Sequence, residues 1–495
     1  MLTDESVSFS TSSLNHYGLV AATCKMLGIA EKIDKKLGKK DERRILTPGV
    51  AVVAMIINGL GFTNNCLYLT AYFFKNKPVD LLLSPHLKSE NITDDTLAKA
   101  LDEIYAYGTT KLFAEIAAEI ALEFQLLGGF SHLDTTSFSL QGDYDCYSED
   151  ENEPRAIKVT YGHSKDKRPD LKQIILSLVM NGPAHIPIWM EGLDGNSSDK
   201  TNFHETIKKM REFQKELNFE EDFTVVADSA LYTLDKLLAQ DYLWICRIPE
   251  TIKEAKSLVE KENVDWIECE DKRYKMHSIL SEYGKKEQRW FMFFSQEAYD
   301  KERITFIKNI KKNEEKIKKE AWHLSHKSFE CAQDALKDFE IFKNKNKMFN
   351  MVCELEEKFK YIKKGHPKEG DPKRSLGHFL KIDITINEGL VNKELETKGR
   401  FILGTNDLNK TDGNKILHHY KDQQHVERGF RFLKDPMFLL DKFFVKKPER
   451  IESLLVIMCF CLMVYNIMQY QIREKLKKEE KTGRLKSEVH AIILG

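Results

Sequence analysis

This 495-residue sequence lacks the closely spaced cysteine motifs that mark metal sites or disulfide frameworks. Its nine cysteines include no C-x2-C pair, so neither a zinc site nor a disulfide framework is indicated. The tightest pair, Cys459 and Cys461, lies inside an apolar run, which is typical of core packing. Unpatterned thiols favour the reducing cytoplasm as the compartment of this protein.

An excess of charge of one sign is also absent. The chain has 76 basic and 77 acidic residues and a net charge of -1. Overall charge therefore gives no argument for binding to nucleic acid, and any basic surface must be local.

Long hydrophobic runs are scarce too. The longest, Leu454 to Tyr465, is too short to cross a bilayer and predicts a buried helix. The N-terminal segment MLTDESVSFS is acidic and polar, unlike a signal peptide. We therefore expect no membrane role. With 42% hydrophobic residues, a chain of this length can bury a substantial core, and we expect two or three domains.

The segment HHYKDQQHVERGFRFLKDP, residues 418 to 436, carries the strongest pattern. Steps of three, four and seven residues return to one side of an α-helix, so its spaced polar side chains should share a face. A carboxylate flanked by cations suits a site that holds a metal ion and a phosphodiester together. The residues concerned are Tyr420, Gln423, Glu427, Arg431 and Lys434.

This segment resembles the Y-x2-R-x3-E-x6-K signature of bacterial insertion-sequence transposases of the DDE type, the large IS-four-type superfamily of cut-and-paste enzymes. Tyr420, Glu427 and Lys434 match the signature, and Gln423 stands at its Arg position. Gln cannot bring a positive charge to a DNA phosphate, but it can donate a hydrogen bond. Either a neighbouring cation such as Arg428 or Arg431 compensates, which we favour, or DNA handling is weakened.

Two candidates for the remaining acids lie upstream. Asp134 is in the alternating segment FSHLDTTSFSL, and Asp228 closes the apolar segment DFTVVADSALY. Between them, residues 161 to 182 resemble the G-x-SKD-x-RPDL-x-Q segment of the same transposases. Each acid alone could be a satisfied strand residue or a helix cap. Their joint occurrence in this order favours Asp134, Asp228 and Glu427 as the catalytic, metal-binding triad.

The resemblance implies transfer at a phosphodiester, where charge builds on the attacking and leaving oxygens. Two divalent cations roughly 3.5 to 4 Å apart can stabilise both oxygens. Mg²⁺ favours carboxylates, phosphate oxygens and retained waters, so three acids are enough. We expect two Mg²⁺ ions with Asp134 bridging them, and we expect Mn²⁺ to substitute.

Further DNA contacts are expected beside the triad. Lys165 and Arg168 of the linking segment could neutralise phosphates, or they could belong to a surface turn. Tyr420, Gln423, Arg431 and Lys434 would position the strand.

The expected fold is α/β: a ribonuclease-H-like mixed-sheet catalytic core, interrupted by a β-containing and helical insertion and preceded by a helical N-terminal domain. Within the core we predict strands at IKVTYG, QIILSLVMNG, TVVAD and YLWICRI, and helices near 200 to 217 and near 233. The predicted boundaries are 1–125 for the N-terminal domain, for DNA-end recognition or dimerisation; 126–248 and 401–495 for the two parts of the core; and 249–400 for the insertion.

The insertion holds strand-like segments, a charged helix and a basic linker at 360 to 374. In related transposases such an insertion can receive a flipped base on an aromatic residue, and Trp266 or Trp290 could serve here. The alternative is that both tryptophans belong to the core.

We therefore expect a transposase that cleaves DNA at insertion-sequence ends and joins the freed 3′-hydroxyls to target DNA. By resemblance, its partners are double-stranded DNA, as terminal inverted repeats and target, and a second copy in a homodimer. Two alternatives stay open. One is a retired transposase that binds DNA without cutting it, and the other is a metal-dependent nuclease without strand transfer.

Overall fold

The computed structural model describes residues 14–38, 44–62, 69–142, 144, 156–217, 223–233, 242–362, 366, 370, 372–410, 412–435 and 447–478. Contacts divide the chain into two compact units. Unit 1 comprises Met1–Arg247, Gly284–Gln288 and Thr405–Gly495, and unit 2 comprises Ile248–Tyr283 and Arg289–Gly404. The 1–125 region thus lies in the same unit as the first strands of the sheet.

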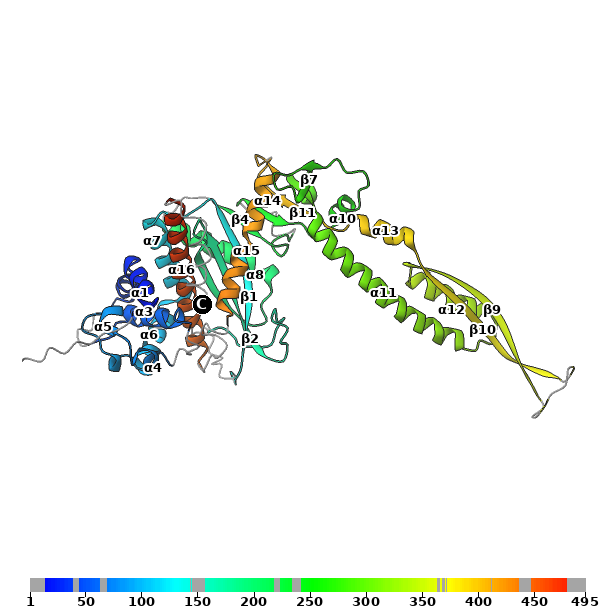
Figure 1. Ribbon diagram of the computed structural model, residues 1–495, viewed down its shortest axis with the longest axis horizontal. Helices are drawn as coiled ribbons and strands as arrows, with labels where there is room; N and C mark the ends of the chain where they lie inside the picture. The colour runs from blue at the N-terminus through cyan, green and yellow to red at the C-terminus, as the bar shows by residue number, and fades with distance from the viewer. Residues whose placement is uncertain are drawn as a thin grey trace, which may run out of the picture. The chain divides into compact units, whose positions relative to one another are not determined.

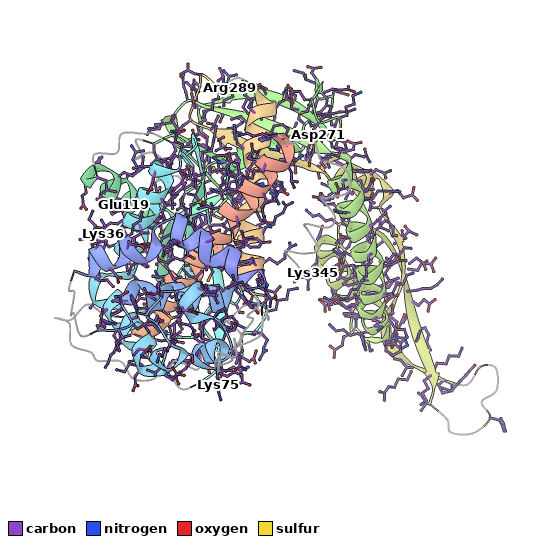
Figure 2. All side chains as sticks on the ribbon, turned by 60° about the vertical axis from the view of Figure 1, so that its left-hand side comes forward. Lys36, Lys75, Glu119, Asp271, Arg289 and Lys345 are labelled. Carbon is purple, nitrogen blue, oxygen red and sulfur yellow. The ribbon has the colours of Figure 1, made fainter. Side chains whose placement is uncertain are left out.

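Unit 1 begins with a helical layer (Figure 1). Thr93 starts α6 as its N-cap, where its hydroxyl accepts a hydrogen bond from the Thr96 amide at 3.3 Å. Lys36 Nζ joins α2 to α7 by lying 3.0 Å from Glu119 Oε1, and Figure 2 shows the two side chains together. The helices are α1 (Tyr17–Met26), α2 (Ile29–Leu37), α3 (Pro48–Gly59), α4 (Thr70–Phe74), α5 (Val79–Leu82), the 3-10 helix η2 (Ser89–Asn91), α6 (Asp94–Tyr107) and α7 (Thr109–Glu123).

The strands of unit 1 follow the order β3-β2-β1-β4-β5. β1 pairs antiparallel with β2, which pairs antiparallel with β3, whereas β1–β4 and β4–β5 are parallel. The sheet is therefore mixed, with β1 at its centre. The strands are β1 (Phe130–Leu140), β2 (Lys172–Asn181), β3 (Ile186–Leu193), β4 (Thr224–Ala227) and β5 (Trp244–Arg247).

Different helices cover the two faces of this sheet. Even-numbered β2 residues such as Leu176 and Leu178 join one core with α15 (Gln424–Leu433) and α16 (Pro448–Lys478). Ser177 points the other way, and its Oγ lies 3.3 Å from Thr206 Oγ1 of α8 (Asp199–Glu216). α14 (Gly413–Asp422) contacts β4 and β5, and α15 contacts β1 and β2.

α16 is the central helix of unit 1. It packs against α3, α6, α7 and β3, which confirms the buried helix predicted at Leu454 to Tyr465. Its 31 residues make it long and apolar enough to cross a membrane, and 89% of its most apolar window is buried inside the protein. Cys459 and Cys461 are fully buried in this core with free thiols.

Unit 2 contains strands in the order β11-β8-β7-β6 and a two-stranded antiparallel sheet of β9 and β10. α11 and α12 pack on the β9–β10 hairpin around Phe329, Phe339 and Leu380 (Figure 1). The elements are α10 (Lys253–Val259), β6 (Ile267–Glu268), β7 (Tyr274–Ser281), the 3-10 helix η3 (Tyr283–Lys285), β8 (Gln288–Ser295), α11 (Gln296–His326), α12 (Ala332–Lys345), β9 (Phe349–Tyr361), β10 (Lys373–Ile386), α13 (Glu388–Glu396) and β11 (Arg400–Thr405). Parts of η3, β8 and β11 are assigned to unit 1.

Two predicted elements differ from the structure. IKVTYG is not a strand, because its one ladder contact is an isolated bridge between Thr160 and Gln173. Instead, β2 is followed by the antiparallel strand β3, which the sequence did not indicate. The helix expected near 233 falls largely outside the described residues. The ends of the expected basic linker pair as strands, Lys373 with Tyr361.

Candidate active site

Two of the three expected acids belong to neighbouring parallel strands. Asp134 lies in the middle of β1, and Asp228 directly follows β4. The register pairs His132 with Val226. Extending it by two residues aligns Asp134 with Asp228, on strands about 4.8 Å apart. The sheet therefore brings two carboxylates that are distant in sequence to the same level.

The third acid is on a helix that covers the same face of the sheet. Asp134 is directly opposite Leu178, so the two side chains share a face. Leu178 belongs to the core that also contains Val426 and Phe430 of α15. Glu427 lies between these two anchors and is exposed. Packing on β1 and β2 thus places α15, the helix of Glu427, on the side of the sheet that carries Asp134.

The charges of Asp228 and Glu427 both act on the phenol of Tyr420. Burial raises the pKa of its phenol to about 12; Arg247 opposes this rise, whereas Asp228 and Glu427 add to it. Tyr420 belongs to α14, which contacts β4 and β5. The phenol is therefore protonated at neutral pH and is a hydrogen-bond donor within electrostatic reach of both carboxylates.

The triad fits divalent metal ions by its chemistry. Three carboxylates supply the hard oxygen ligands that Mg²⁺ and Mn²⁺ prefer. Among the described residues, the three side chains do not meet within 4.8 Å of one another. Ions about 3.5 to 4 Å apart, each about 2 Å from its ligands, do not require such close approach between outer carboxylates.

One group of side chains does meet that distance: His418, His419 and Asp422 of α14 have ligand atoms within 4.8 Å of one another. His418 Nδ1 lies 3.2 Å from Asp422 Oδ2, and the His419 ring stacks on Phe130 with centroids 3.4 Å apart. Two imidazoles and a carboxylate suit Zn²⁺ or Ni²⁺ better than Mg²⁺. This set is thus chemically distinct from the acid triad.

Lys165 lies beside Asp134. Its Nζ is 4.0 Å from Asp134 Oδ1 and donates hydrogen bonds to the carbonyl and hydroxyl oxygens of Thr135 at 2.7 and 2.8 Å. Its backbone amide also donates to Ser137 Oγ at 3.0 Å. The linking segment is therefore fastened along β1, which places an ammonium group at the first acid.

Lys434, at the end of α15, is held by the same segment. Its Nζ lies 2.6 Å from Asp166 Oδ1 and 5.6 Å from the centroid of the Phe138 ring. Asp166 follows Lys165 directly, so neighbouring residues of one loop contact the first acid and the signature lysine. The structure thus brings Lys165 and Lys434 to the same strand.

The expected single helical face is interrupted at Gln423. α14 ends at Asp422 and α15 starts at Gln424, with Gln423 between them. Gln423 is only 7% exposed, Tyr420 and Lys434 are half-buried, and Glu427 is exposed. Gln423 keeps helical backbone angles, with φ -55° and ψ -25°, so the expected face carries side chains of unequal exposure.

The two remaining expected DNA-contacting residues are arginines at the surface. Arg168 forms a bidentate pair with Asp170, at 2.9 Å from Nε and 2.8 Å from Nη2. Arg431 is exposed on α15 and lines a cleft on the flank of that helix. Neither arginine contacts the acids directly.

Sequence reasoning missed two charged residues of this region. Arg247, the last residue of β5, acts on Tyr420 electrostatically and is exposed. Asp166 is the partner of Lys434. Its place in the SKD triplet next to Lys165 was a usable signal, whereas nothing in the local sequence singled out Arg247.

The two tryptophans of the insertion differ in exposure. Trp290 in β8 is fully buried, so no base can stack on it in this structure. The alternative interpretation, that Trp290 is a core residue, is confirmed. Trp266 is half-buried against Phe294, with the Arg400 guanidinium 5.7 Å from its ring centroid.

Comparison with known proteins places this site in a family. The model of the transposase DDE domain matches residues 133–466, and that of a domain of unknown function (DUF4277) matches residues 9–118. No curated protein gives a significant match. Among solved structures, the chain is similar to one in a cryo-EM structure of a piggyBac transposase synaptic complex with hairpin DNA, at 10% identity and a TM-score of 0.32, covering 95% of this chain and 70% of that chain.

The match to the DDE-domain model over residues 133–466 defines the class of this protein as a DDE enzyme. The chain belongs to the transposase DDE domain family, whose model covers more than half of it. It is thus a DDE transposase, an enzyme class that acts on DNA with divalent metal ions.

Proposed function

We propose that this protein is a cut-and-paste transposase of the IS-four type with a ribonuclease-H-like catalytic core. The strand order β3-β2-β1-β4-β5, with an antiparallel meander followed by two parallel strands, supports this core. The observation that supports the proposal most is the parallel pairing of β1 with β4, in which Asp134 and Asp228 each lie two residues beyond the pair His132–Val226, together with the packing of α15 on β1 and β2.

Asp134, Asp228 and Glu427 would hold two divalent ions, Mg²⁺ or in its place Mn²⁺, which stabilise charge on the attacking and leaving oxygens when bound. The residues of the chain orient the substrate. Tyr420 remains protonated and can donate to a phosphate oxygen. The ammonium groups of Lys165 and Lys434 lie close to β1, and on DNA binding they would exchange their bonds to Thr135 and Asp166 for bonds to phosphate oxygens.

The surrounding residues would shape DNA binding. Arg168 and Arg431 are exposed cations for phosphates, and Arg431 compensates for the charge that Gln423 lacks. The backbone carbonyl of Gln423, between α14 and α15, accepts a hydrogen bond from Val426 N at 3.0 Å. Trp266 is the remaining candidate for stacking on a base.

The reaction we propose has two stages at one site. Water attacks a phosphodiester at the element end, and the freed 3′-hydroxyl then attacks target DNA. A homodimer would hold the two ends, with residues 1–125 contributing end recognition or dimerisation and residues 249–400 acting as an insertion in the core. The bacterial cytoplasm is the proposed compartment.

The test is an incubation of purified protein with labelled DNA ends and a target plasmid, with Mg²⁺ or with a chelator. Joined products that require both the metal and Glu427 support the transposase. Cleavage without joining would instead indicate a nuclease, and binding without cleavage a retired DNA-binding protein. Glu427→Gln and Glu474→Gln form a matched pair, because Glu474 lies in the last turns of α16 and is not among the residues that the proposal assigns to the catalytic site.

A further inference from the structure

A cationic cleft lies on the flank of α15 within unit 1. Its volume is about 520 Å³, and it is lined by residues of α15, α16 and the β2–β3 turn. A volume of this size is typical of sites that hold small ligands or parts of larger ones. Neither the triad nor Lys165 and Lys434 line it.

Three arginines give the cleft its charge. Arg428 and Arg431 come from α15, and Arg473 comes from α16. The side-chain hydrogen bonds that Arg428 and Arg473 form go to amide oxygens. Asp435 is the one acidic residue among the described residues of the lining, so positive charge prevails there.

Hydrogen bonds hold two of these guanidinium groups in place. Arg428 Nη2 donates to Gln424 Oε1 at 3.1 Å, and Arg473 Nη2 donates to Gln469 Oε1 at 3.2 Å. A guanidinium has five N–H donors, so most donors of each arginine are left for another acceptor. Neutral amide partners orient the arginines without cancelling their charge.

The wall of the cleft at the β2–β3 turn is rigid. The rings of His185 and His425 stack with centroids 3.5 Å apart, and Asn466 Nδ2 donates to the His185 carbonyl at 2.6 Å. Burial lowers the pKa of His185 to about 4, so this imidazole is neutral at physiological pH. The permanent positive charge of the cleft therefore comes from its arginines.

Aromatic side chains form its apolar floor. Phe432 stacks on Tyr465 with centroids 4.7 Å apart and meets the edge of Phe62 at 6.1 Å. An apolar floor limits the water that screens the arginines and strengthens their attraction for an anion.

The cleft and the acids occupy different sides of α15. Arg428, Phe432 and Asp435 are spaced by four and three residues, so they form one stripe of the helix. Glu427 and Lys434 are spaced by seven residues and form another stripe. Arg431 is four residues from Glu427 and also lines the cleft, so it lies at the border between the two stripes.

We propose that this cleft binds a backbone phosphate of DNA, as a second point of contact outside the catalytic face. A guanidinium fork matches two phosphate oxygens, and the cleft stands on the helix that carries Glu427. A strand fixed there would be oriented relative to the acids. The inference rests on the proposed function only in taking DNA as the polyanion.

The test compares the wild-type chain, the double variant Arg428→Gln/Arg473→Gln and the control Arg303→Gln from exposed α11. Binding of a fluorescent duplex is measured with chelator at several salt concentrations. We expect a loss of about tenfold or more in affinity for the double variant. The slope of log affinity against log salt should fall by about 0.9 per lost phosphate contact. Inorganic phosphate should raise the melting temperature of the wild type more than that of the double variant.

An unchanged affinity and slope in the double variant would overturn the proposal. Stabilisation by inorganic phosphate that disappears in the double variant, with DNA binding unchanged, would also overturn it, because the cleft would then hold a free phosphate. Circular dichroism confirms that the variants are folded. Because no chemistry occurs with chelator, failure of strand joining in the Mg²⁺ assay would refute the proposed function and leave this result standing.

Discussion

Two helices of equal length behave in opposite ways in this protein. α16 and α11 each have 31 residues, but α16 buries most of its side chains in unit 1, whereas α11 buries only Ile310, Ile317 and Ala321 in unit 2. The exposed side of α11 carries pairs four residues apart, such as Glu314 with Lys318 at 2.6 Å. Burial therefore holds α16, and local pairing with a narrow apolar stripe holds α11.

The difference bears on function because α16 packs against α15, which carries Glu427. A site that needs carboxylates in fixed positions benefits from a rigid, buried support. Most side chains of α11 are outside the core of unit 2, so substitutions on its charged surface should cost little folding stability.

The contrast between the two helices is tested most strongly by an isoleucine-to-alanine substitution on each of them. Ile457→Ala in α16 removes a fully buried side chain and should cost about 2 to 5 kcal/mol of unfolding free energy. Ile304→Ala in α11 removes a side chain that is 68% exposed and should change stability by about 0.5 kcal/mol or less. Urea unfolding measures both, and equal costs would contradict the comparison.

A buried carboxyl group on α16 gives the next largest effect. Burial raises the pKa of Glu452 from its usual 4.5 to about 7, although Ile157 N and Thr109 Oγ1 each donate to it at 3.3 Å. The folded state therefore keeps the proton above pH 4.5, and stability falls as pH rises through about 7. The loss between pH 5 and 8 is of the order of 3 kcal/mol.

Glu452→Gln should remove most of this pH dependence. Thermal unfolding between pH 5 and 8 measures it, with Glu474→Gln near the end of α16 as the control. A variant whose melting temperature still falls with pH as steeply as that of the wild type would refute the role of Glu452.

The pair that fastens the start of α16 to α6 should contribute less. Arg450 binds Asp102 through Nε at 2.7 Å and Nη2 at 2.8 Å, and the bond to Arg450 lowers the pKa of Asp102. The pair is partly exposed, so Arg450→Gln should cost about 1 kcal/mol. Because the pKa of Asp102 is lowered, this stabilisation should be lost on acidification, which urea unfolding at pH 7 and at low pH can detect.

The smallest effect is expected on α11. Lys318→Gln removes one exposed pair and should cost about 0.3 to 0.5 kcal/mol. High salt should abolish the difference from wild type. A cost above that of Arg450→Gln would show that charge pairs matter more on α11 than its exposure suggests.

The sequence predicts the placement of the acids on strands and a helix, since β1, β4 and α15 each carry a clear apolar pattern around them. It does not predict β3, because Pro187 argues against a strand, yet proline is tolerated where β3 lies at the edge of the unit 1 sheet order. IKVTYG has strand composition but only one bridge, and its Gly162 lies against the backbone of Gly195, where a Cβ would clash.

The break at Gln423 also escapes the sequence, because no glycine or proline marks it. Spacing alone gives no reason to divide residues 413 to 433 into two helices. In the structure, α14 packs on β4 and β5, whereas α15 packs on β1 and β2. The arginine cleft could not be predicted from the sequence either, because Arg473 is distant from α15 in sequence and lies near it only in the folded chain.

The central claim is that Asp134, Asp228 and Glu427 hold the catalytic ions. Strand joining by Asp134→Cys, compared in Mg²⁺ and in Mn²⁺, tests it most directly, with exposed Asp80→Cys as control. A thiolate is a softer ligand that Mg²⁺ avoids and Mn²⁺ tolerates better. The account predicts that Asp134→Cys is inactive in Mg²⁺ and regains joining in Mn²⁺, while Asp80→Cys works in both. Full joining by Asp134→Cys in Mg²⁺ would contradict it.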